Sequence, residues 1–204
     1  MTFIPADSPQ WLPARIGCLT ASRFALATAR TKSGWAASRD KMLKELLAER
    51  LTGFAADHYV TEAMQWGTDH EAEAWERYEE QFGILVATAG LFMHPSIAFC
   101  GASPDRLIGS DGLGESKCPT TTTHITWTLN GVVPEEYKPQ MLLQLACTRR
   151  KWVNFVSFDP RVPEAKQLFV RRYEPLAEEI AAAEKLAADF LAELEAMFEC
   201  FTTA

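Results

Sequence analysis

The stretch Gly101–Pro119, GASPDRLIGSDGLGESKCP, constrains the fold of this chain more than any other segment. It contains an Asp-Gly dipeptide between two short apolar segments, which is a strong signal for a β-hairpin. Side chains alternate along a strand, so Glu115 and Lys117 share one face while Ser116 points away. A hairpin of this length brings Asp105 across from Glu115. The stretch therefore predicts two carboxylates and one ammonium group on one face of a sheet, which is costly to bury without a function.

These groups suit chemistry on a phosphate. Two hard oxygen ligands close together are typical of Mg²⁺ or Mn²⁺ sites, and Mg²⁺ in proteins commonly meets substrate phosphates. A lysine beside such a site can orient or polarise a water molecule, or offset the negative charge that builds up on a phosphorus centre. A surface hairpin with solvated charges explains the same residues, so this stretch alone leaves both interpretations open.

Length and composition favour a single globular domain over residues 1–204. The sequence has no apolar run of about 18 residues, so we expect no membrane span. Its first residues lack a basic segment followed by an apolar one, so no signal peptide is expected either. The five cysteines form no Cys-x-x-Cys pair, which is typical of reduced thiols in a cytoplasmic protein.

The formal net charge of −7 argues against a protein that coats nucleic acid nonspecifically. It does not argue against one that threads nucleic acid through a locally basic channel. Acidic residues are concentrated at 174–198, whereas 13–50 and 149–172 are richer in lysine and arginine. An acidic exterior with a basic interior explains this distribution, and so does an ordinary acidic cytosolic protein.

Apolar periodicity and turn residues predict a mixed order of helices and strands. Helices are expected at about 20–29, 37–51, 61–82, 134–148 and 175–199. Strands are expected at 84–94, 98–108, 114–118, 151–158 and 168–173. The threonine-rich segment 120–131 is expected to be a polar connection. This order indicates an α/β fold with a mixed central sheet and helices on its faces.

The helix expected over 61–82 supplies a further candidate acid. Glu71 lies at the edge of its expected apolar face, which is made of Met64, Ala72, Trp75 and Phe82. The other acids of this helix are assigned to a solvated face. Glu71 is therefore the one carboxylate of the segment that we expect near the sheet.

Several motifs follow one another around this hairpin: Trp11…Arg15-x-Gly17-x-x-Thr20-Ala21-Ser22, Trp66-Gly67-x-x-x-Glu71, Ala102-Ser103-Pro104-Asp105, Glu115-x-Lys117-Cys118-Pro119, Gln140-x-x-x-Gln144 and Asp159-Pro160-Arg161. With these motifs in this order, the chain resembles the lambda-type (YqaJ-like) alkaline exonuclease family of phage recombinases. That family belongs to the PD-(D/E)xK nuclease superfamily. The resemblance covers roughly residues 11–161, which is most of the chain.

The resemblance implies a PD-(D/E)xK nuclease-like core at about 61–158. The N-terminal helices over 11–52 would contribute a 5′-phosphate site, and a C-terminal helix over 175–199 would complete the domain. Family members degrade one strand of linear double-stranded DNA processively from its 5′ end, with Mg²⁺ as cofactor and Mn²⁺ as a substitute. They release 5′-mononucleotides and leave a 3′ single-stranded tail. They form a homotrimer ring around DNA and pass the tail to a single-strand annealing protein. The expected location is the cytoplasm of the bacterial host, and phage, prophage or bacterial origin stays open.

The resemblance also implies the metal ligands. Asp105 and Glu115 would bind the metal together with the main-chain carbonyl of Ser116. Glu71 would join them as a third acid, near a second metal or its waters. These roles agree with the oxygen chemistry expected of the hairpin.

Two side chains would act on the water and the phosphate. Lys117 would position the attacking water, and Gln140 would help to hold that water or the scissile phosphate. From the residues alone, an exposed amide on a helix is the favoured interpretation of Gln140. One position departs from the family, because Arg106 follows Asp105 where members usually have glycine. Arg106 would add a phosphate contact or point to solvent, and it removes no ligand.

The resemblance assigns the 5′-terminal phosphate to Arg15, Ser22 and Ser103. A guanidinium and two hydroxyls suit a phosphate, because arginine offers a two-pronged set of donors and hydroxyls fill the remaining acceptors. Lys32, in a polar loop, would contact the DNA backbone. From the residues alone, a surface ion pair is the commoner role for a lone arginine such as Arg15. A flexible, solvated lysine explains position 32 equally well.

Three other functions remain open at this point. An endonuclease could use the same core, and a nicking assay on closed circular DNA separates the two. A catalytically idle DNA-end-binding protein is a second alternative, against which the intact set of Glu71, Asp105, Glu115 and Lys117 argues. A metalloenzyme acting on another substrate is the third, and nothing else in the sequence points to a small-molecule pocket.

Overall fold

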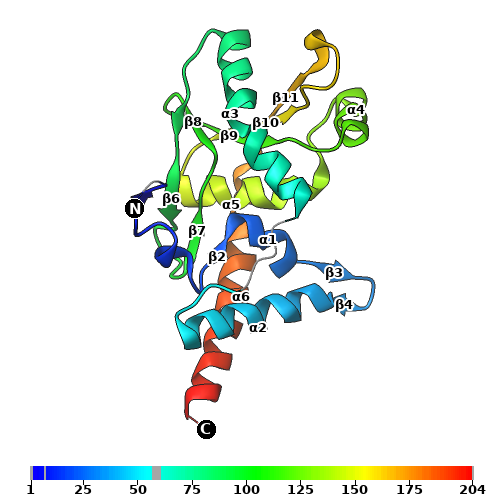
Figure 1. Ribbon diagram of the computed structural model, residues 1–204. Coiled ribbons are helices and arrows are strands. Elements are labelled where there is room, and N and C mark those ends of the chain that lie inside the picture. The colour runs from blue at the N-terminus through cyan, green and yellow to red at the C-terminus, as the bar shows by residue number, and fades with distance from the viewer. Residues whose placement is uncertain (1, 7, 57–60, 204) are drawn as a thin grey trace.

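β-Sheets flanked by helices make up the computed structural model, which describes residues 2–6, 8–56 and 61–203 (Figure 1). Its helices are α1 (Ala21–Ala27), α2 (Ala37–Thr52), α3 (Glu62–Phe82), α4 (Thr121–Asn130), α5 (Lys138–Thr148) and α6 (Ala177–Thr203). Its strands are β1 (Phe3–Pro5), β2 (Leu19–Thr20), β3 (Arg30–Thr31), β4 (Gly34–Trp35), β5 (Ala87–Thr88), β6 (Gly90–Met93), β7 (Cys100–Ala102), β8 (Arg106–Ile108), β9 (Gly112–Lys117), β10 (Trp152–Phe158) and β11 (Leu168–Tyr173). Short 3-10 turns lie at Pro13–Arg15, Glu135–Tyr137 and Glu164–Lys166.

The central sheet has the strand order β11-β10-β9-β8-β5. Strands β9 and β10 run parallel, and the other neighbours run antiparallel. Both faces are covered, because α4 and α5 pack on one side and α3 on the other. A strand buried on both sides is expected to be apolar throughout, as β10 largely is. The mixed α/β fold predicted from the sequence is therefore confirmed.

The two faces of β9 carry different side chains, and this determines which of them can reach the candidate site. Leu113 joins the apolar cluster of α4 and α5, so Glu115 and Lys117 face α5 as well. Gly114 faces α3, where a Cβ atom would lie 2.2 Å from the indole of Trp75. Only glycine allows α3 to approach the strand this closely. This contact holds one turn of α3, including Glu71, above the end of β9.

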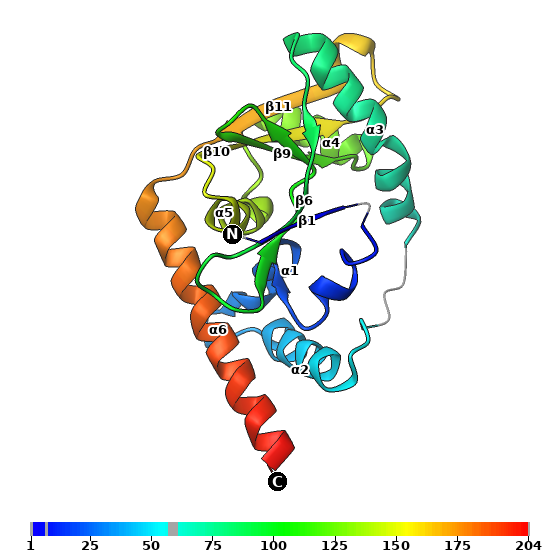
Figure 2. The same ribbon diagram turned by 90° about the vertical axis from the view of Figure 1, so that its left-hand side faces the viewer.

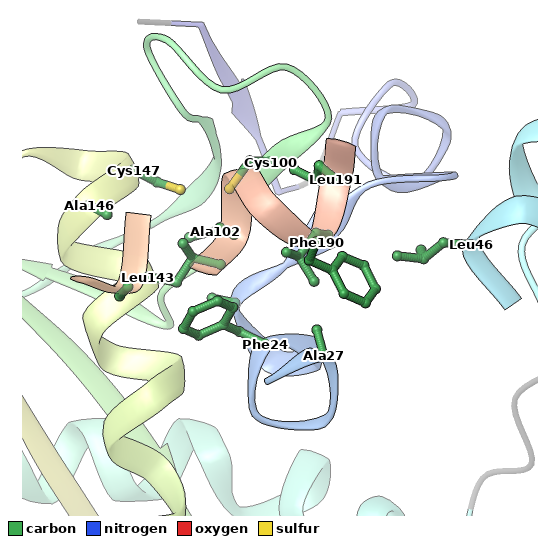
Figure 3. Packing of buried hydrophobic residues seen from close by; sticks show 14 of the residues in the cluster. Phe24, Ala27, Leu46, Cys100, Ala102, Leu143, Ala146, Cys147, Phe190 and Leu191 are labelled. Carbon is green, nitrogen blue, oxygen red and sulfur yellow. The ribbon is translucent and has the colours of Figure 1, made fainter. Parts of the chain in front are cut away.

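A second sheet, β1-β6-β7-β2, packs with the N-terminal and C-terminal helices. Its core contains side chains from α1, α2, α5, α6 and β7, among them Phe24, Leu46, Leu143, Phe190 and Ala102 (Figure 3). Figure 2 shows α6 crossing this region and extending beyond α2 at its C-terminal end. None of the helices in the described ranges is both long and apolar enough to cross a membrane.

The segment 120–131, expected to be a polar connection, is largely helix α4. The Thr120 side chain accepts a hydrogen bond from the backbone N–H of Thr123 and so caps the helix. His124 and Trp127 are buried on its inner face. The expectation was wrong because threonine has a low intrinsic helix propensity, and tertiary packing overrides that weak preference here.

Two long strands expected from the sequence are each interrupted. The first, at 84–94, forms β5 and β6, which belong to different sheets. The second, at 98–108, forms β7 and β8, with Asp105 in the bend between them. The bend follows Pro104, which has no N–H to contribute to a strand ladder. Asp105 therefore lies just before a strand rather than inside one.

The apolar face expected for α3 was also wrong in part. Trp75 is buried as expected, but Met64, Ala72 and Phe82 are exposed. The buried positions are Ala74, Trp75 and Tyr78, where the helix lies on β9 and β10. The N-terminal half of α3 extends past the sheet, so its side chains line a cleft instead of the core.

Candidate active site

A cleft of about 730 Å³ opens at the C-terminal end of β9, between the first half of α3 and the turn before α5. Four of the predicted site residues, Glu71, Asp105, Ser116 and Lys117, line it. They come from a helix, a bend and a strand that the Trp75 contact and the β8–β9 pairing hold together. The cleft is of the size that binds ligands such as nucleotides.

Glu115 precedes two residues that line this cleft, Ser116 and Lys117, and is itself 1% exposed. Its Oε1 accepts hydrogen bonds from Lys117 Nζ and from Gln140 Nε2, the latter at 2.6 Å. Its Oε2 accepts one from Gln144 Nε2 at 2.5 Å. A buried carboxylate is costly unless its oxygens are hydrogen-bonded, and these three donors meet that requirement.

Asp105 is held against the edge of β9. Its Oδ2 accepts hydrogen bonds from the backbone N–H of Ser116 at 2.7 Å and from the Ser116 hydroxyl at 2.8 Å. Burial and the nearby charge of Glu115 raise the pKa of Asp105 to about 7. Because the two carboxylates repel each other, a cation bound beside them would stabilise their charged forms.

Lys117 remains charged in this position. Burial opposes its positive charge, but Glu115 and Asp105 outweigh burial and raise the pKa of its ammonium group. Its Nζ also lies 5.2 Å from the centre of the Tyr137 ring. The site therefore holds one fixed cation beside two acids, as the alternation of the strand predicted.

Glu71 and Arg106 form an ion pair that the sequence did not predict. Arg106 Nη1 donates to Glu71 Oε1 at 3.2 Å and to the backbone oxygen of Asp105 at 2.8 Å. The Arg106 side chain is only 17% exposed, so it does not point freely into solvent. Glu71 lines the cleft, but in this structure it is bound to a guanidinium.

A divalent cation fits the donor chemistry of Asp105 and Glu115. In the described part of the chain, no group of three or more histidine, cysteine, aspartate or glutamate side chains is placed to hold a metal. The N–H of Ser116 points to Asp105, and in an extended strand the carbonyl of the same residue points to the same side. The buried Oε1 of Gln144 also lacks a hydrogen-bond partner among the described residues. Two acids, one carbonyl and an unsatisfied oxygen are compatible with Mg²⁺.

The residues expected to bind a 5′-phosphate are brought together only in part. Arg15 Nη1 donates to the Ser103 hydroxyl at 3.0 Å, and its guanidinium lies 4.4 Å from the centre of the Trp11 ring. Ser22 instead lies 3.3 Å from the Thr20 hydroxyl. Lys32 is exposed in the turn between β3 and β4. The structure thus pairs Arg15 with Ser103 and leaves Ser22 and Lys32 outside that pair.

Sequence reasoning gave no role to several residues of the site. Gln144 was part of a recognised motif, and its i, i+4 spacing from Gln140 could have placed both amides on one face of α5. Trp66 and Arg161 also belonged to motifs, and both line the cleft with Tyr137. No local signal links Trp66 to Arg161, because the contact depends on the tertiary fold.

Comparisons with known proteins identify the family and related structures. A model of the YqaJ-like viral recombinase domain matches residues 10–151. Crystal structures of the alkaline exonuclease LHK-Exo from Laribacter hongkongensis, and of LHK-Exo in complex with dAMP, have TM-scores of 0.88 and 0.89. Both are 44% identical, and each match covers 96% of this chain and 97% of that chain.

A more distant structure shares the fold alone. A phage-related exonuclease from Haemophilus somnus 129PT has a TM-score of 0.58 at 14% identity, with 87% of this chain and 96% of that chain covered. A search of the curated proteins found no match. The two levels of similarity agree on the same α/β arrangement around the central sheet.

Proposed function

The chain belongs to the YqaJ-like viral recombinase family and is a nuclease of the alkaline exonuclease type, and from this premise we propose that it is a Mg²⁺-dependent, processive 5′→3′ exonuclease. Its substrate would be linear double-stranded DNA with 5′-phosphorylated ends. Its products would be 5′-mononucleotides and a 3′ single-stranded tail. The observation that carries the proposal is the grouping of Asp105 and Lys117 at the cleft with the buried Glu115, whose charge acts on both.

The metal ligands are Asp105, Glu115 and the main-chain carbonyl of Ser116. When bound there, Mg²⁺ supplies Lewis-acid stabilisation of the phosphate and lowers the pKa of a water molecule, and Mn²⁺ can substitute. Glu71 is the candidate for a third acidic ligand. Arg106 binds Glu71 Oε1, so Glu71 would take that role through Oε2 or after the ion pair opens.

Lys117 and Gln140 act on the reacting groups. Lys117 keeps its charge beside the acids, so it can orient the attacking water and offset charge on the phosphate as the bond to the 3′ oxygen breaks. Gln140 donates to Glu115, which holds its amide beside that carboxylate. Because these groups are fixed before substrate arrives, little reorganisation is needed during hydrolysis.

Arg15 and Ser103 form the first part of the 5′-phosphate site, with Ser22 and Lys32 as further contacts. Burial and the nearby Arg23 lower the pKa of the Arg15 guanidinium, so an anion beside it would be stabilising. Asp105 follows Ser103 by one intervening proline. A phosphate bound at Ser103 would therefore be held close to the acids.

Membership of the family is the ground on which we also propose an assembly and a partner. A homotrimer ring would keep DNA from dissociating sideways and so make hydrolysis processive. A single-strand annealing protein would receive the 3′ tail. The end of α6, where Phe201 is exposed, offers an apolar surface that assembly would cover. Sedimentation of the purified chain, with and without a short duplex, tests the trimer.

Incubation with three DNA substrates tests the activity. Linear duplexes with 5′-phosphate or 5′-hydroxyl ends are compared with closed circular DNA, each with Mg²⁺ or with a chelator. We expect metal-dependent loss of one strand from the linear 5′-phosphorylated duplex and no change in the circle. Cutting of the circle would show an endonuclease, and binding of ends without cutting would show an idle end-binding protein.

A further inference from the structure

Two motifs without an assigned role meet on one wall of the cleft. Trp66 lies near the start of α3, and Arg161 follows β10. The Arg161 guanidinium carbon lies 4.3 Å from the centre of the Trp66 ring. Both side chains line the same cleft as Asp105 and Lys117. A cation stacked on an indole therefore faces the space that the proposed function assigns to DNA.

Arg161 is held rigidly in this position. Its Nε donates to Asp159 Oδ1 at 2.7 Å, and its Nη2 donates to Asp159 Oδ2 at 3.1 Å and to the backbone oxygen of Pro119 at 3.0 Å. Asp159 is fully buried. The two charges largely cancel, and the Nε and Nη2 donors of the guanidinium are turned toward the protein. The flat face of the guanidinium is then the main surface offered to a ligand, on a side chain that is 44% exposed.

The indole beneath Arg161 is supported from behind. The Trp66 and His70 rings stack with their centres 3.7 Å apart and their planes 26° from parallel. His70 is fixed in turn, because its Nδ1 lies 2.9 Å from the backbone oxygen of Trp66. Two groups this close to the centre of one ring must lie on opposite faces of it. His70, Trp66 and Arg161 therefore form three layers, with Arg161 as the open end.

We propose that the open face of Arg161 is a stacking site for an unpaired nucleobase of the DNA strand in the cleft. An arginine face is flat, delocalised and weakly hydrated, so it stacks on any base regardless of sequence. A phosphate is a poorer ligand for this surface, because Asp159 neutralises Arg161 and Glu62 and Glu71 line the same cleft. The inference rests on the proposed function, since it needs DNA in the cleft.

This site complements the acids at the end of β9. Asp105, Glu115 and Lys117 act on the phosphate backbone, and they cannot fix the rotation of a nucleotide about that backbone. A stacked base supplies the missing constraint, and it does so without selecting a sequence. The DNA strand would then be held at two points, by a base stacked on Arg161 and by its phosphate at the end of β9.

Arg161→Lys is the sharpest variant. It keeps a positive charge beside the buried Asp159, so the fold is retained, but it removes the flat face. Arg161→Ala is a second variant, checked by thermal melting because it leaves Asp159 unpaired. Arg172→Ala is the matched control, since Arg172 stacks at 3.8 Å on Trp152 and neither residue lines the cleft.

The full-length chain is assayed with Mg²⁺ on linear 5′-phosphorylated duplexes, either intact or with one abasic nucleotide at successive positions from the 5′ end. We expect Arg161→Lys to raise KM about tenfold on intact DNA, the size expected for loss of one stacked base, with a smaller change in kcat. An abasic nucleotide at one position should raise the KM of the wild type equally and leave the variant unchanged. Arg172→Ala should behave as wild type throughout.

Two results would overturn the inference. If Arg161→Lys has the KM of the wild type on every substrate, charge is sufficient and no base stacks there. If the variant and the abasic substitution have independent effects at every position, Arg161 contacts something other than a base. Failure of the proposed function looks different, because the wild type would then leave the intact linear duplex uncut, and the inference would fall with it.

Discussion

Two charged regions meet at Pro104: one around Asp105, and one around Arg15 and its partner Ser103. The first is short of positive charge and the second is short of negative charge. Beside Asp105, burial and the charge of Glu115 raise the carboxyl pKa to about 7. Beside Arg15, burial and the charge of Arg23 lower the guanidinium pKa. The first region therefore gains from a bound cation and the second from a bound anion. A metal ion and a terminal phosphate are the ligands that the proposed function requires at these two places.

The regions also differ in how far they are assembled without ligands. Glu115 already accepts hydrogen bonds from one lysine and two glutamines. Arg15 reaches one of its two expected hydroxyl partners, Ser103. The difference indicates that the fold organises the proposed hydrolytic region, and it favours a proposed end-binding region that its ligand would complete. Substitutions should therefore affect turnover most in the first region and substrate preference most in the second.

Loss of the ammonium group from the hydrolytic region should have the largest effect. Lys117→Met keeps much of the side-chain volume but leaves no charge to orient water or stabilise the phosphate. We expect kcat to fall about 10³-fold, with duplex binding changed less than about threefold. Single-turnover hydrolysis and fluorescence anisotropy measure the two quantities. Lys151→Met is the control, because Lys151 is exposed and pairs with Asp111 away from the cleft. Normal turnover in Lys117→Met would rule out the assigned role.

The raised pKa of Asp105 predicts how stability depends on pH without metal. An aspartate in an unfolded chain has a pKa of about 3.9. Because the folded pKa is higher, the folded protein binds the proton more tightly. The stabilising contribution is complete below about pH 4 and is lost as the pH rises through 7. The free energy of unfolding should fall by up to about 4 kcal/mol from this group between those pH values.

Urea unfolding across this pH range, with chelator or with Mg²⁺, measures the effect. Mg²⁺ should reduce the loss, because it binds the deprotonated carboxylates and competes with the proton. Asp105→Asn should remove most of the difference between acid and neutral pH, since the amide does not titrate. A metal-free wild type and Asp105→Asn with the same pH dependence would show that Asp105 is not perturbed in this way.

The same comparison explains what could be predicted from the sequence. The hydrolytic hairpin was predictable because its residues are close in sequence, its turn is encoded by Asp-Gly, and strand alternation fixes which side chains share a face. Asp105 was harder to place, because the bend after Pro104 interrupts the expected strand. Local pattern therefore gave the set of side chains, and tertiary structure gave their arrangement.

Contacts between distant segments were not predictable in the same way. Glu71 was expected beside the metal, but its pairing with Arg106 depends on how α3 lies across the sheet. The meeting of Trp66 with Arg161 depends on the same helix and on the turn after β10. Helix α4 was missed because burial of Trp127 overrides the weak helix preferences of five threonines. The family resemblance supplied the residues of these motifs but not their contacts.

A substitution in the proposed end-binding region should change the preference for 5′-phosphorylated ends more than it changes turnover. Arg15→Ala removes the guanidinium whose pKa is lowered by burial and by Arg23, and so removes the main attraction for an anion. We expect the preference for 5′-phosphorylated over 5′-hydroxyl ends to fall about 10-fold to 100-fold, because a charge-assisted hydrogen bond contributes about 1.5–3 kcal/mol. Competition between the two duplexes in one reaction measures the ratio. Arg77→Ala is the control, since Arg77 pairs with surface acids. An unchanged ratio in Arg15→Ala would place the phosphate elsewhere.

Substitution of the two serines assigned to the same phosphate should change the preference for phosphorylated ends by different amounts. These are the smallest effects that we expect. Ser103 already accepts a hydrogen bond from Arg15, whereas Ser22 is exposed and lies beside Thr20. We expect Ser103→Ala to reduce the preference for phosphorylated ends about threefold to tenfold, the size of one ordinary hydrogen bond, and Ser22→Ala to change it less than about twofold. The competition assay resolves these values. Equal losses in both variants would show that the region closes around its ligand and brings Ser22 to the phosphate, and the contrast with the preassembled hydrolytic region would then be larger than this structure indicates.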